Sequence, residues 1–313
     1  MEKKGTRDYY GQTLLELGKQ NPKIVALDAD LSASTKTCLF AKQFPERFFD
    51  CGVAEADMIG TAAGLSLCGF IPFVSTFAVF GTGRCYDQIR QSVCISRTNV
   101  KIVVTHGGIT VGEDGATHQM LEDIALMTSL PNMRVIVPAD AHQTSAVIKF
   151  IANEDGPFYV RLSRDKFPVI YGEETTFRLP FAEVLREGKD VVIYATGLMV
   201  HQALSCAEIL SKSGIEAEVV NVASIKPLEK ETIVSSAKKC KIALTLEEHS
   251  IINGLGAQIS SLLSEEFPIP IKILGIEDRF GISGKPDELL KFFGLDAETI
   301  SSKVKDFIDK RKG

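Results

Sequence analysis

The sequence predicts an α/β protein with two domains, each built on a largely parallel sheet. Continuous apolar strands recur along the chain, and segments with helical periodicity separate them. Such strands are typical of parallel sheets covered on both faces. The alternation stops at residues 164–189, which are richer in charge and proline, and then resumes. A chain of 313 residues is long enough for about two domains.

The first domain is expected to span residues 1–170. Its apolar strands are predicted at 23–30, 101–108, 134–140 and 158–163. Helical patterns lie near 7–20, 36–44, 55–68, 83–97, 118–128 and 140–153. Strands that alternate with helices in this way indicate parallel pairing through helical crossovers.

Residues 171–189 are expected to form a linker, and residues 190–313 a smaller second domain. Its strands are predicted at 190–196, 216–223, 241–249 and 270–276. Its helices are predicted near 199–213, 229–238, 254–265, 286–293 and 296–311. The same alternation predicts a second parallel sheet.

Composition excludes several classes of function. The net charge is −5 and no arginine-rich stripe occurs, so we expect no nucleic-acid partner. No apolar run approaches the roughly 20 residues of a membrane span, and the N-terminus lacks the apolar stretch of a secretory signal. Seven cysteines without a CxxC pair fit neither a disulfide framework nor a zinc site. We therefore expect a cytoplasmic protein that does not bind membranes.

Polar residues cluster where the predicted strands of the first domain end. Asp28 and Asp30 close one strand, His106 through His118 follow another, and Arg161 and Arg164 close a third. In open parallel sheets, ligands bind outside the carboxyl ends of the strands. The sequence therefore predicts a ligand site at one edge of the first sheet, with Arg161 as a structural residue.

The stretch THGGITVGEDGATHQ, residues 105–119, is the most unusual segment at that edge. Its four glycines permit positive φ angles and a close approach of the backbone to a ligand. No GxxxxGK[ST] or post-strand GxGxxG motif accompanies it, which argues against a standard nucleotide phosphate loop. The spacing of His106 and His118 is not that of a helical metal pair, so no metal ligand is predicted in this chain.

A second candidate group precedes this loop. Glu55 opens a strongly apolar helical segment, and Phe77 and Phe80 follow. Taken one at a time, the acid is interpreted as a residue that stabilises a helix N-terminus, and the phenylalanines as core residues. Taken together, a carboxylate in an apolar setting and nearby aromatic faces favour a site for a flat heterocycle.

Several motifs resemble one enzyme family. They are GVAEADM (52–58), STFAVF (75–80), THGGITVGEDGATHQ, SLPNMRVIVPAD (129–140), VRLSR (160–164) and IEDRFGISGKPDELLKFFGL (276–295). The first five are similar to the pyrimidine-binding domain of transketolase, and the last to the transketolase C-terminal domain. The resemblance covers nearly the whole chain. It implies the thiamin diphosphate enzyme fold, and transfer of a two-carbon ketol unit from a ketose phosphate to an aldose phosphate through a thiamin diphosphate carbanion.

The resemblance also implies a partner. A complete transketolase carries a diphosphate-binding domain with a GDG motif, followed by an asparagine that helps to hold Mg²⁺. The GEDG segment here has no asparagine at the matching distance. The chain therefore resembles the small subunit of a split transketolase. We expect an N-terminal subunit to hold Mg²⁺ and the diphosphate, and self-association to a dimer within a heterotetramer.

The resemblance assigns cofactor contacts to five residues. Glu55 matches the acid that hydrogen-bonds the pyrimidine ring and assists proton removal from the cofactor. Phe77 and Phe80 match the stacking aromatics, and a third aromatic of many members is replaced by Gly83. Asp30 and Val53 match positions near the cofactor.

The sugar substrate is assigned a further set by the same resemblance. Its phosphate would meet Arg7, Ser34, His106 and Arg164, where arginine suits phosphate because it donates two parallel hydrogen bonds. Asp114 matches a contact to a donor hydroxyl beside the ketone. His118 matches a residue near the donor carbonyl. With Glu55, these last two are the predicted catalytic residues.

Other functions remain open from sequence alone. The β subunits of 2-oxo-acid dehydrogenases and the second half of deoxyxylulose-phosphate synthase have the same two domains and use pyruvate. The GEDGATHQ form and the predicted phosphate set favour transketolase over both. A non-enzymatic paralogue would be marked by loss of the catalytic acid, and Glu55 is present.

Overall fold

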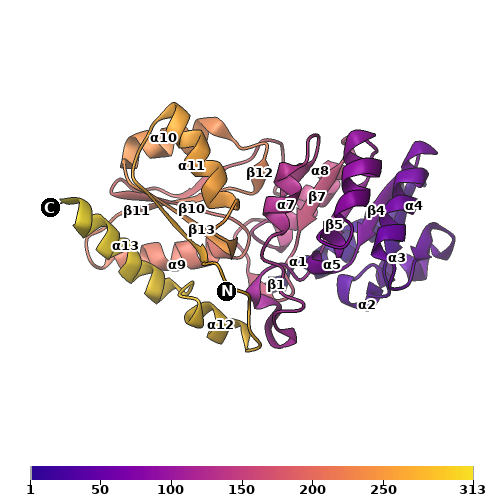
Figure 1. The fold of residues 1–313 in the computed structure, drawn as a ribbon, viewed down its shortest axis with the longest axis horizontal. Helices are drawn as coiled ribbons and strands as arrows, with labels where there is room; N and C mark the ends of the chain where they lie inside the picture. Colours follow the sequence, from indigo (N-terminus) through magenta and orange to yellow (C-terminus); the bar gives the residue numbers. More distant parts are fainter. Residues whose placement is uncertain (1, 313) are drawn as a thin grey trace.

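The computed structural model describes residues 2–312 and has two sheets that lie side by side along the long axis of the molecule (Figure 1). The first half of the chain, coloured indigo to magenta, surrounds one sheet. The second half, coloured from salmon pink through orange to yellow, surrounds the other. The predicted α/β class is therefore confirmed. No helix among the described residues combines the length and the apolar character that crossing a membrane requires.

The first sheet has seven strands, and the six that come from the first domain run parallel. In order across the sheet they are β12 (Ser224–Lys226), β6 (Arg134–Ile136), β7 (Phe158–Arg161), β5 (Lys101–Val104), β4 (Ile71–Ser75), β2 (Ile24–Asp28) and β3 (Phe48–Asp50). Because residues buried on both faces dominate these strands, they lack the polar alternation of a half-exposed sheet.

Helices cover both faces of this sheet. One face packs on α1 (Thr6–Gln20), α3 (Cys38–Gln43) and α8 (Ala141–Ala152). The other packs on α4 (Glu55–Leu67), α7 (Asp123–Ser129) and a π-helical turn at Ile89–Ile95. Helix α8 begins close to its predicted start. Asp140 caps its N-terminus, since the Asp140 side chain accepts a hydrogen bond from the Gln143 N–H at 2.7 Å. Short helical turns complete this half: α2 (Ser32–Thr35), Pro45–Arg47, α5 (Ala78–Thr82), α6 (Tyr86–Gln88) and Ile109–Asp114.

The second sheet has five strands. In order they are β14 (Ile271–Ile276), β13 (Ala243–Ser250), β10 (Val191–Ala195), β11 (Ala217–Asn221) and the antiparallel edge strand β9 (Glu183–Arg186). Helices α9 (Met199–Ser211), α12 (Pro286–Phe292) and α13 (Ala297–Lys312) pack on one face. Helices α10 (Lys230–Cys240) and α11 (Leu255–Glu266) pack on the other.

The two halves share structure. Strand β12 lies in the second half of the chain but pairs antiparallel with β6, so it completes the first sheet. One apolar cluster contains Val135 of the first sheet, Val192 and Tyr194 of the second sheet, and Met127 of α7. A small sheet of β1 (Lys3–Gly5) and β8 (Lys166–Pro168) lies beside them. Strand β9 lies inside residues 171–189, where the sequence predicted only a linker.

Some elements differ from their prediction. Strands β3 and β4 were not predicted. Strand β3 has only three residues, and β4 lies in an apolar stretch that directly follows the predicted helix at 55–68. The helix predicted at 83–97 divides into α6 and the π-helical turn. The pattern at 36–44 begins later, at Cys38, after the separate turn α2. The buried strands and long amphipathic helices otherwise lie close to their predicted ranges.

Candidate active site at the carboxyl ends of the first sheet

Parallel register brings the predicted site residues to one edge. Asp28 at the end of β2 pairs with Ser75 at the end of β4, and Val104 at the end of β5 pairs with Arg161 at the end of β7. The segments that follow these strands carry most of the predicted residues. The convergence predicted from the strand ends is therefore present.

Glu55 is the first residue of α4 and is only 2% exposed. Its two carboxylate oxygens accept hydrogen bonds from Arg84 Nη1 at 3.0 and 2.8 Å. The Arg84 guanidinium also lies over the Phe80 ring, 4.7 Å from its centroid. A buried acid is thus connected to an aromatic face through one half-exposed cation.

Four rings form a layered group beside this acid. Phe77 stacks on His106 with 3.7 Å between ring centroids and on Phe80 with 6.0 Å. His118 meets Phe80 edge to face at 5.5 Å. Phe77 and His106 are nearly fully buried, whereas Phe80 and His118 are partly exposed. The group therefore presents an aromatic surface of which one side is accessible.

His106 is a neutral imidazole at neutral pH. Burial, together with the positive charges of Arg7 and Arg164, lowers its pKa to about 3. Its Nδ1 lies 2.7 Å from the Thr105 hydroxyl. His106 can therefore hydrogen-bond a substrate but cannot supply a positive charge to it. This refines the role that the sequence predicted, in which His106 joined two arginines at a phosphate.

The glycine-rich loop, residues 105–119, has the backbone that its sequence requires. Gly108, Gly112 and Gly115 have φ angles of 83°, 86° and 73°. These are left-handed values that other residues rarely adopt. Between them the chain makes the short helical turn Ile109–Asp114. The loop thereby presents Asp114 and His118 at the surface while His106 stays buried.

Two guanidinium groups border the loop. Arg7 Nη1 donates a 3.1 Å hydrogen bond to the Ser34 carbonyl oxygen, and burial lowers the pKa of Arg7, with the charge of Arg164 acting in the same direction. Arg164 donates to the Val111 carbonyl oxygen, and its Nη1 lies 3.7 Å from Asp114 Oδ2. A pair of neighbouring, partly desolvated cations is a favourable site for an anion.

Asp30 and Val53 are the two predicted cofactor residues with exposed side chains. Val53 is 73% exposed, and Asp30 is also exposed, at a φ angle of 62°. Within residues 2–312 Asp30 donates its backbone N–H to Asp50 Oδ1 at 3.1 Å, and its carboxylate makes no ion pair. Their predicted role beside a cofactor stays a prediction.

The sequence analysis missed Arg84, and it named Asp28 at a strand end without giving it a role. Arg84 lies one helical turn beyond Phe80, a spacing at which a cation can cover a ring, and this signal was available. Asp28 is fully buried and accepts hydrogen bonds from the Leu31 N–H at 2.7 Å and from the hydroxyls of Thr35 and Thr37 at 2.6 and 2.8 Å. It therefore fixes the turn that carries Ser34.

The Arg84–Glu55 pair makes a testable contribution to stability. We expect Arg84→Met to destabilise the chain by about 1 kcal/mol, because a buried carboxylate loses its partner while solvent screens the half-exposed cation. The same change in a Glu55→Gln background should cost clearly less. Urea unfolding of the four proteins in this cycle measures the difference. Arg90→Met, at an exposed position in the following helical turn, is the control. If Arg84→Met cost the same free energy of unfolding in both backgrounds, the coupling between Arg84 and Glu55 would be contradicted.

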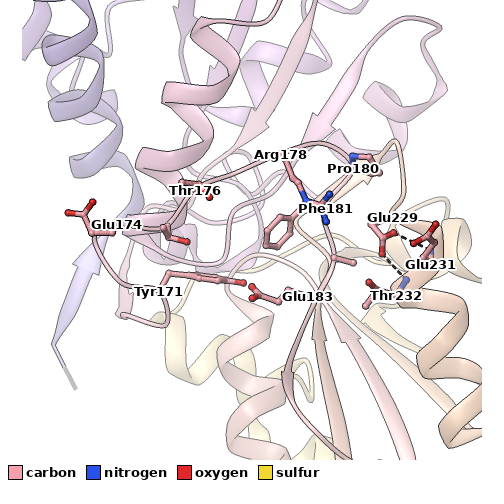
Figure 2. Close-up of a pocket in the computed structure, with 12 residues that line it drawn as sticks. Tyr171, Glu174, Thr176, Arg178, Pro180, Phe181, Glu183, Glu229, Glu231 and Thr232 are labelled. Atoms are coloured by element: carbon pink, nitrogen blue, oxygen red, sulfur yellow. Dashed lines mark hydrogen bonds between the residues drawn. The ribbon is translucent and has the colours of Figure 1, made fainter.

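A separate cavity lies away from this edge. It has a volume of about 550 Å³ and lies between the segment 171–183 and the start of α10. Figure 2 shows Glu183, Glu229 and Glu231 around it, with Arg178 as a cation and with Glu229 hydrogen-bonded to the N-terminus of α10. None of the predicted site residues lines this cavity, so it is not part of the candidate active site.

Comparison with known proteins decides the family. The profile of the transketolase pyrimidine-binding domain matches residues 2–169, and that of the transketolase C-terminal domain matches residues 181–300. A putative transketolase C-terminal section from Methanocaldococcus jannaschii is 50% identical over 98% of this chain and 97% of its own length. The chain belongs to the transketolase family. The sequence resemblance is thereby confirmed.

Two further members show how close the relationship is. The 6-deoxy-6-sulfo-D-fructose transketolase subunit of a Clostridium species is 43% identical, over 96% of this chain and 93% of that one. A solved structure described as a split gene transketolase, an inactive beta4 tetramer, is 49% identical and superimposes with a TM-score of 0.91. The superposition covers 97% of this chain and 98% of the chain in that structure. The transketolase fold thus extends over both sheets.

The residues at the sheet edge fit the pyrimidine half of thiamin diphosphate, the cofactor of transketolases. A flat aminopyrimidine needs a hydrogen-bonding acid beside an apolar, aromatic face. Glu55 supplies the acid, and the stacked rings of Phe77 and Phe80 supply the aromatic face. Arg84 contacts both Glu55 and the Phe80 ring. Among residues 2–312 no group of three or more histidine, cysteine, aspartate or glutamate side chains is arranged to hold a metal ion.

Proposed function

We propose that this chain is the small subunit of a two-chain transketolase. It transfers a two-carbon ketol unit from a ketose phosphate to an aldose phosphate with thiamin diphosphate and Mg²⁺. The observation that carries the proposal is the arrangement at the sheet edge: a buried acid beside a ring stack, and two arginines beside the glycine-rich loop. One part suits a cofactor ring and the other an anionic sugar.

In this proposal Glu55 holds a proton at the pyrimidine ring nitrogen. Thiamin diphosphate supplies the carbon nucleophile and the electron sink that carbonyl transfer needs. Arg84 Nη1 contacts both oxygens of Glu55 in this structure, and the carboxylate keeps further lone pairs for that contact. Phe77 and Phe80 orient the ring and exclude water from one of its faces. The low exposure of Glu55 strengthens every hydrogen bond made there.

The same proposal assigns roles to the polar residues. Arg7 and Arg164 bind the anionic end of the sugar, helped by Ser34 and by neutral His106. Asp114 and His118, which the loop presents at its partly exposed side, contact the donor hydroxyl and carbonyl. His118 is positioned for this by its Thr117 neighbour, whose hydroxyl lies 2.9 Å from Nδ1.

A partner subunit is part of the proposal. The names of similar proteins support it, since they describe a C-terminal section, a transketolase subunit and a split gene transketolase. The exposed sides of Phe80, Arg84, His118 and Val53 also give a second chain access to the cofactor region. We propose that an N-terminal subunit holds the diphosphate and Mg²⁺, in an assembly of two copies of each chain.

The test is a reconstituted assay. The chain is mixed with its N-terminal subunit, thiamin diphosphate and Mg²⁺, and ketol transfer from xylulose 5-phosphate to ribose 5-phosphate is measured. A donor with a terminal sulfonate is a second arm, because one relative is named for such a sugar. Transfer from either donor that needs both chains supports the proposal. Turnover of pyruvate without transfer from either sugar would overturn it.

A further inference from the structure

The glycine-rich loop is held from outside by the C-terminal domain. On one side, the Thr110 N–H donates a 2.5 Å hydrogen bond to the Glu248 carboxylate of β13. The same carboxylate fills the space beside Gly108, where a Cβ atom would lie only 2.2 Å from it. Gly108 is therefore required both by its φ angle of 83° and by the packing of Glu248.

On the other side, the turn 281–284 contacts the loop. Gln119 Nε2 donates to the Ile282 carbonyl oxygen at 2.9 Å, and the Ser283 hydroxyl donates to the Glu113 carbonyl oxygen at 2.7 Å. A Cβ atom at Gly281 would overlap the Gln119 side chain. This turn belongs to the motif that begins at residue 276, far from the loop in sequence.

Glu248 itself is fixed from behind. Its carbonyl oxygen accepts a 2.9 Å hydrogen bond from Arg161 Nη2, and the same nitrogen donates to the Met120 carbonyl oxygen at 3.3 Å. Arg161 is 6% exposed, and its Nε lies 2.8 Å from Asp123 Oδ2. Arg161 is thus a structural residue, as predicted, and it joins the loop end to β13.

These contacts fall beside the residues that the proposed function uses. Ser283 bonds the residue before Asp114, and Gln119 is the residue after His118. Glu248 bonds the loop between His106 and Asp114. None of the three contacting side chains belongs to the ring stack or to the arginine pair. Their effect on chemistry must therefore pass through the position of the loop.

We propose that the C-terminal domain positions the sugar-binding loop, with Glu248 and Ser283 as the positioning residues. The domain then has a role in the active site although it contributes no catalytic group there. Loss of either contact should loosen residues 108–115 and leave Glu55, Phe77 and Phe80 in place, because these three residues lie on other segments. The kinetic part of this inference rests on the proposed function, whereas its structural part does not.

The structural test is hydrogen–deuterium exchange on the whole chain. In Glu248→Met, which keeps the length of the side chain and removes the acceptor, we expect peptides over residues 108–115 to exchange about five to ten times faster. Glu248→Gln keeps an acceptor oxygen and should restore most of the protection. Glu247→Met is the matched control. Glu247 is equally buried, but it accepts from the Leu255 and Gly256 N–H groups inside its own domain.

Glu247→Met should change exchange near the start of α11 and leave the loop protected. Unchanged loop exchange in Glu248→Met, or an equal increase in both variants, would overturn the role of Glu248. If Glu248→Met does not fold, Ser283→Ala tests the proposal instead. Ser283 is exposed, and the substitution removes a single hydrogen bond. It should speed exchange over residues 111–115 about fivefold, and unchanged exchange there would overturn the proposal.

The kinetic test uses the reconstituted enzyme with both chains. We expect Ser283→Ala to raise the donor KM about threefold to tenfold, with the thiamin diphosphate Kd unchanged. An unchanged KM, or a loss of cofactor affinity instead, would contradict positioning of the sugar. If the wild-type pair transfers no ketol unit, the proposed function fails, and the exchange experiment still decides whether the domain positions the loop.

Discussion

Glu55→Gln is expected to lower kcat of the reconstituted enzyme by about two to four orders of magnitude, the range typical of a lost general acid–base. The amide keeps nearly the same shape and can still accept a hydrogen bond from Arg84, so the fold should survive. It cannot exchange a proton with a ring nitrogen as a carboxyl group can. The measurement is the steady-state rate of ketol transfer at saturating cofactor.

The control for this variant lies on the same helix. Asp57 is an exposed acid in the first turn of α4, two residues after Glu55. We expect Asp57→Asn to stay within about twofold of the wild-type rate, because surface substitutions of this kind have small effects. Equal rates for Glu55→Gln and Asp57→Asn would show that Glu55 is not the catalytic acid.

Arg7→Gln is expected to raise KM for a phosphorylated donor by about tenfold to a hundredfold, the value of one charge-assisted hydrogen bond. Arg7 makes one side-chain hydrogen bond to the protein among residues 2–312, which leaves donors for a ligand. The KM for the same sugar without its phosphate should change less than about threefold. Parallel titrations with the two donors measure the difference.

Arg164 provides an informative contrast. Because it also donates to the Val111 carbonyl oxygen in the glycine-rich loop, we expect Arg164→Gln to impair both donors rather than the phosphorylated one alone. Arg178→Gln is the distant control, since this exposed residue lines the separate cavity of Figure 2. If Arg7→Gln weakened both donors equally, Arg7 would not be a phosphate contact.

Much of the fold was predictable because strands that are buried on both faces are apolar along most of their length. Strands β2, β5 and β10 are continuous apolar runs, and each lies within its predicted range. Strand β4 was missed because its apolar neighbours on both sides hide its ends. Strand β12 could not be predicted, since it pairs with a strand from the other half of the chain.

The candidate site was predictable where its residues follow strands. The glycine-rich loop and Arg164 fall at strand ends, so parallel register alone brings them together. Contacts between distant segments were not predictable in this way. Glu248 looks like an ordinary strand residue in the sequence, and only the packing of the second sheet against the loop shows its partner. The left-handed glycines were predicted as a group, but the carboxylate beside Gly108 was not.

The most direct test of the account is a calorimetric titration of thiamin diphosphate, with Mg²⁺ present, into this chain, into the N-terminal subunit, and into their mixture. We predict tight binding in the mixture, at one cofactor for each pair of chains, and weak binding to either chain alone. Glu55→Gln should weaken the binding seen in the mixture. Binding to the N-terminal subunit alone that matches the mixture, with no effect of Glu55→Gln, would contradict the claim that this chain supplies half of the cofactor site.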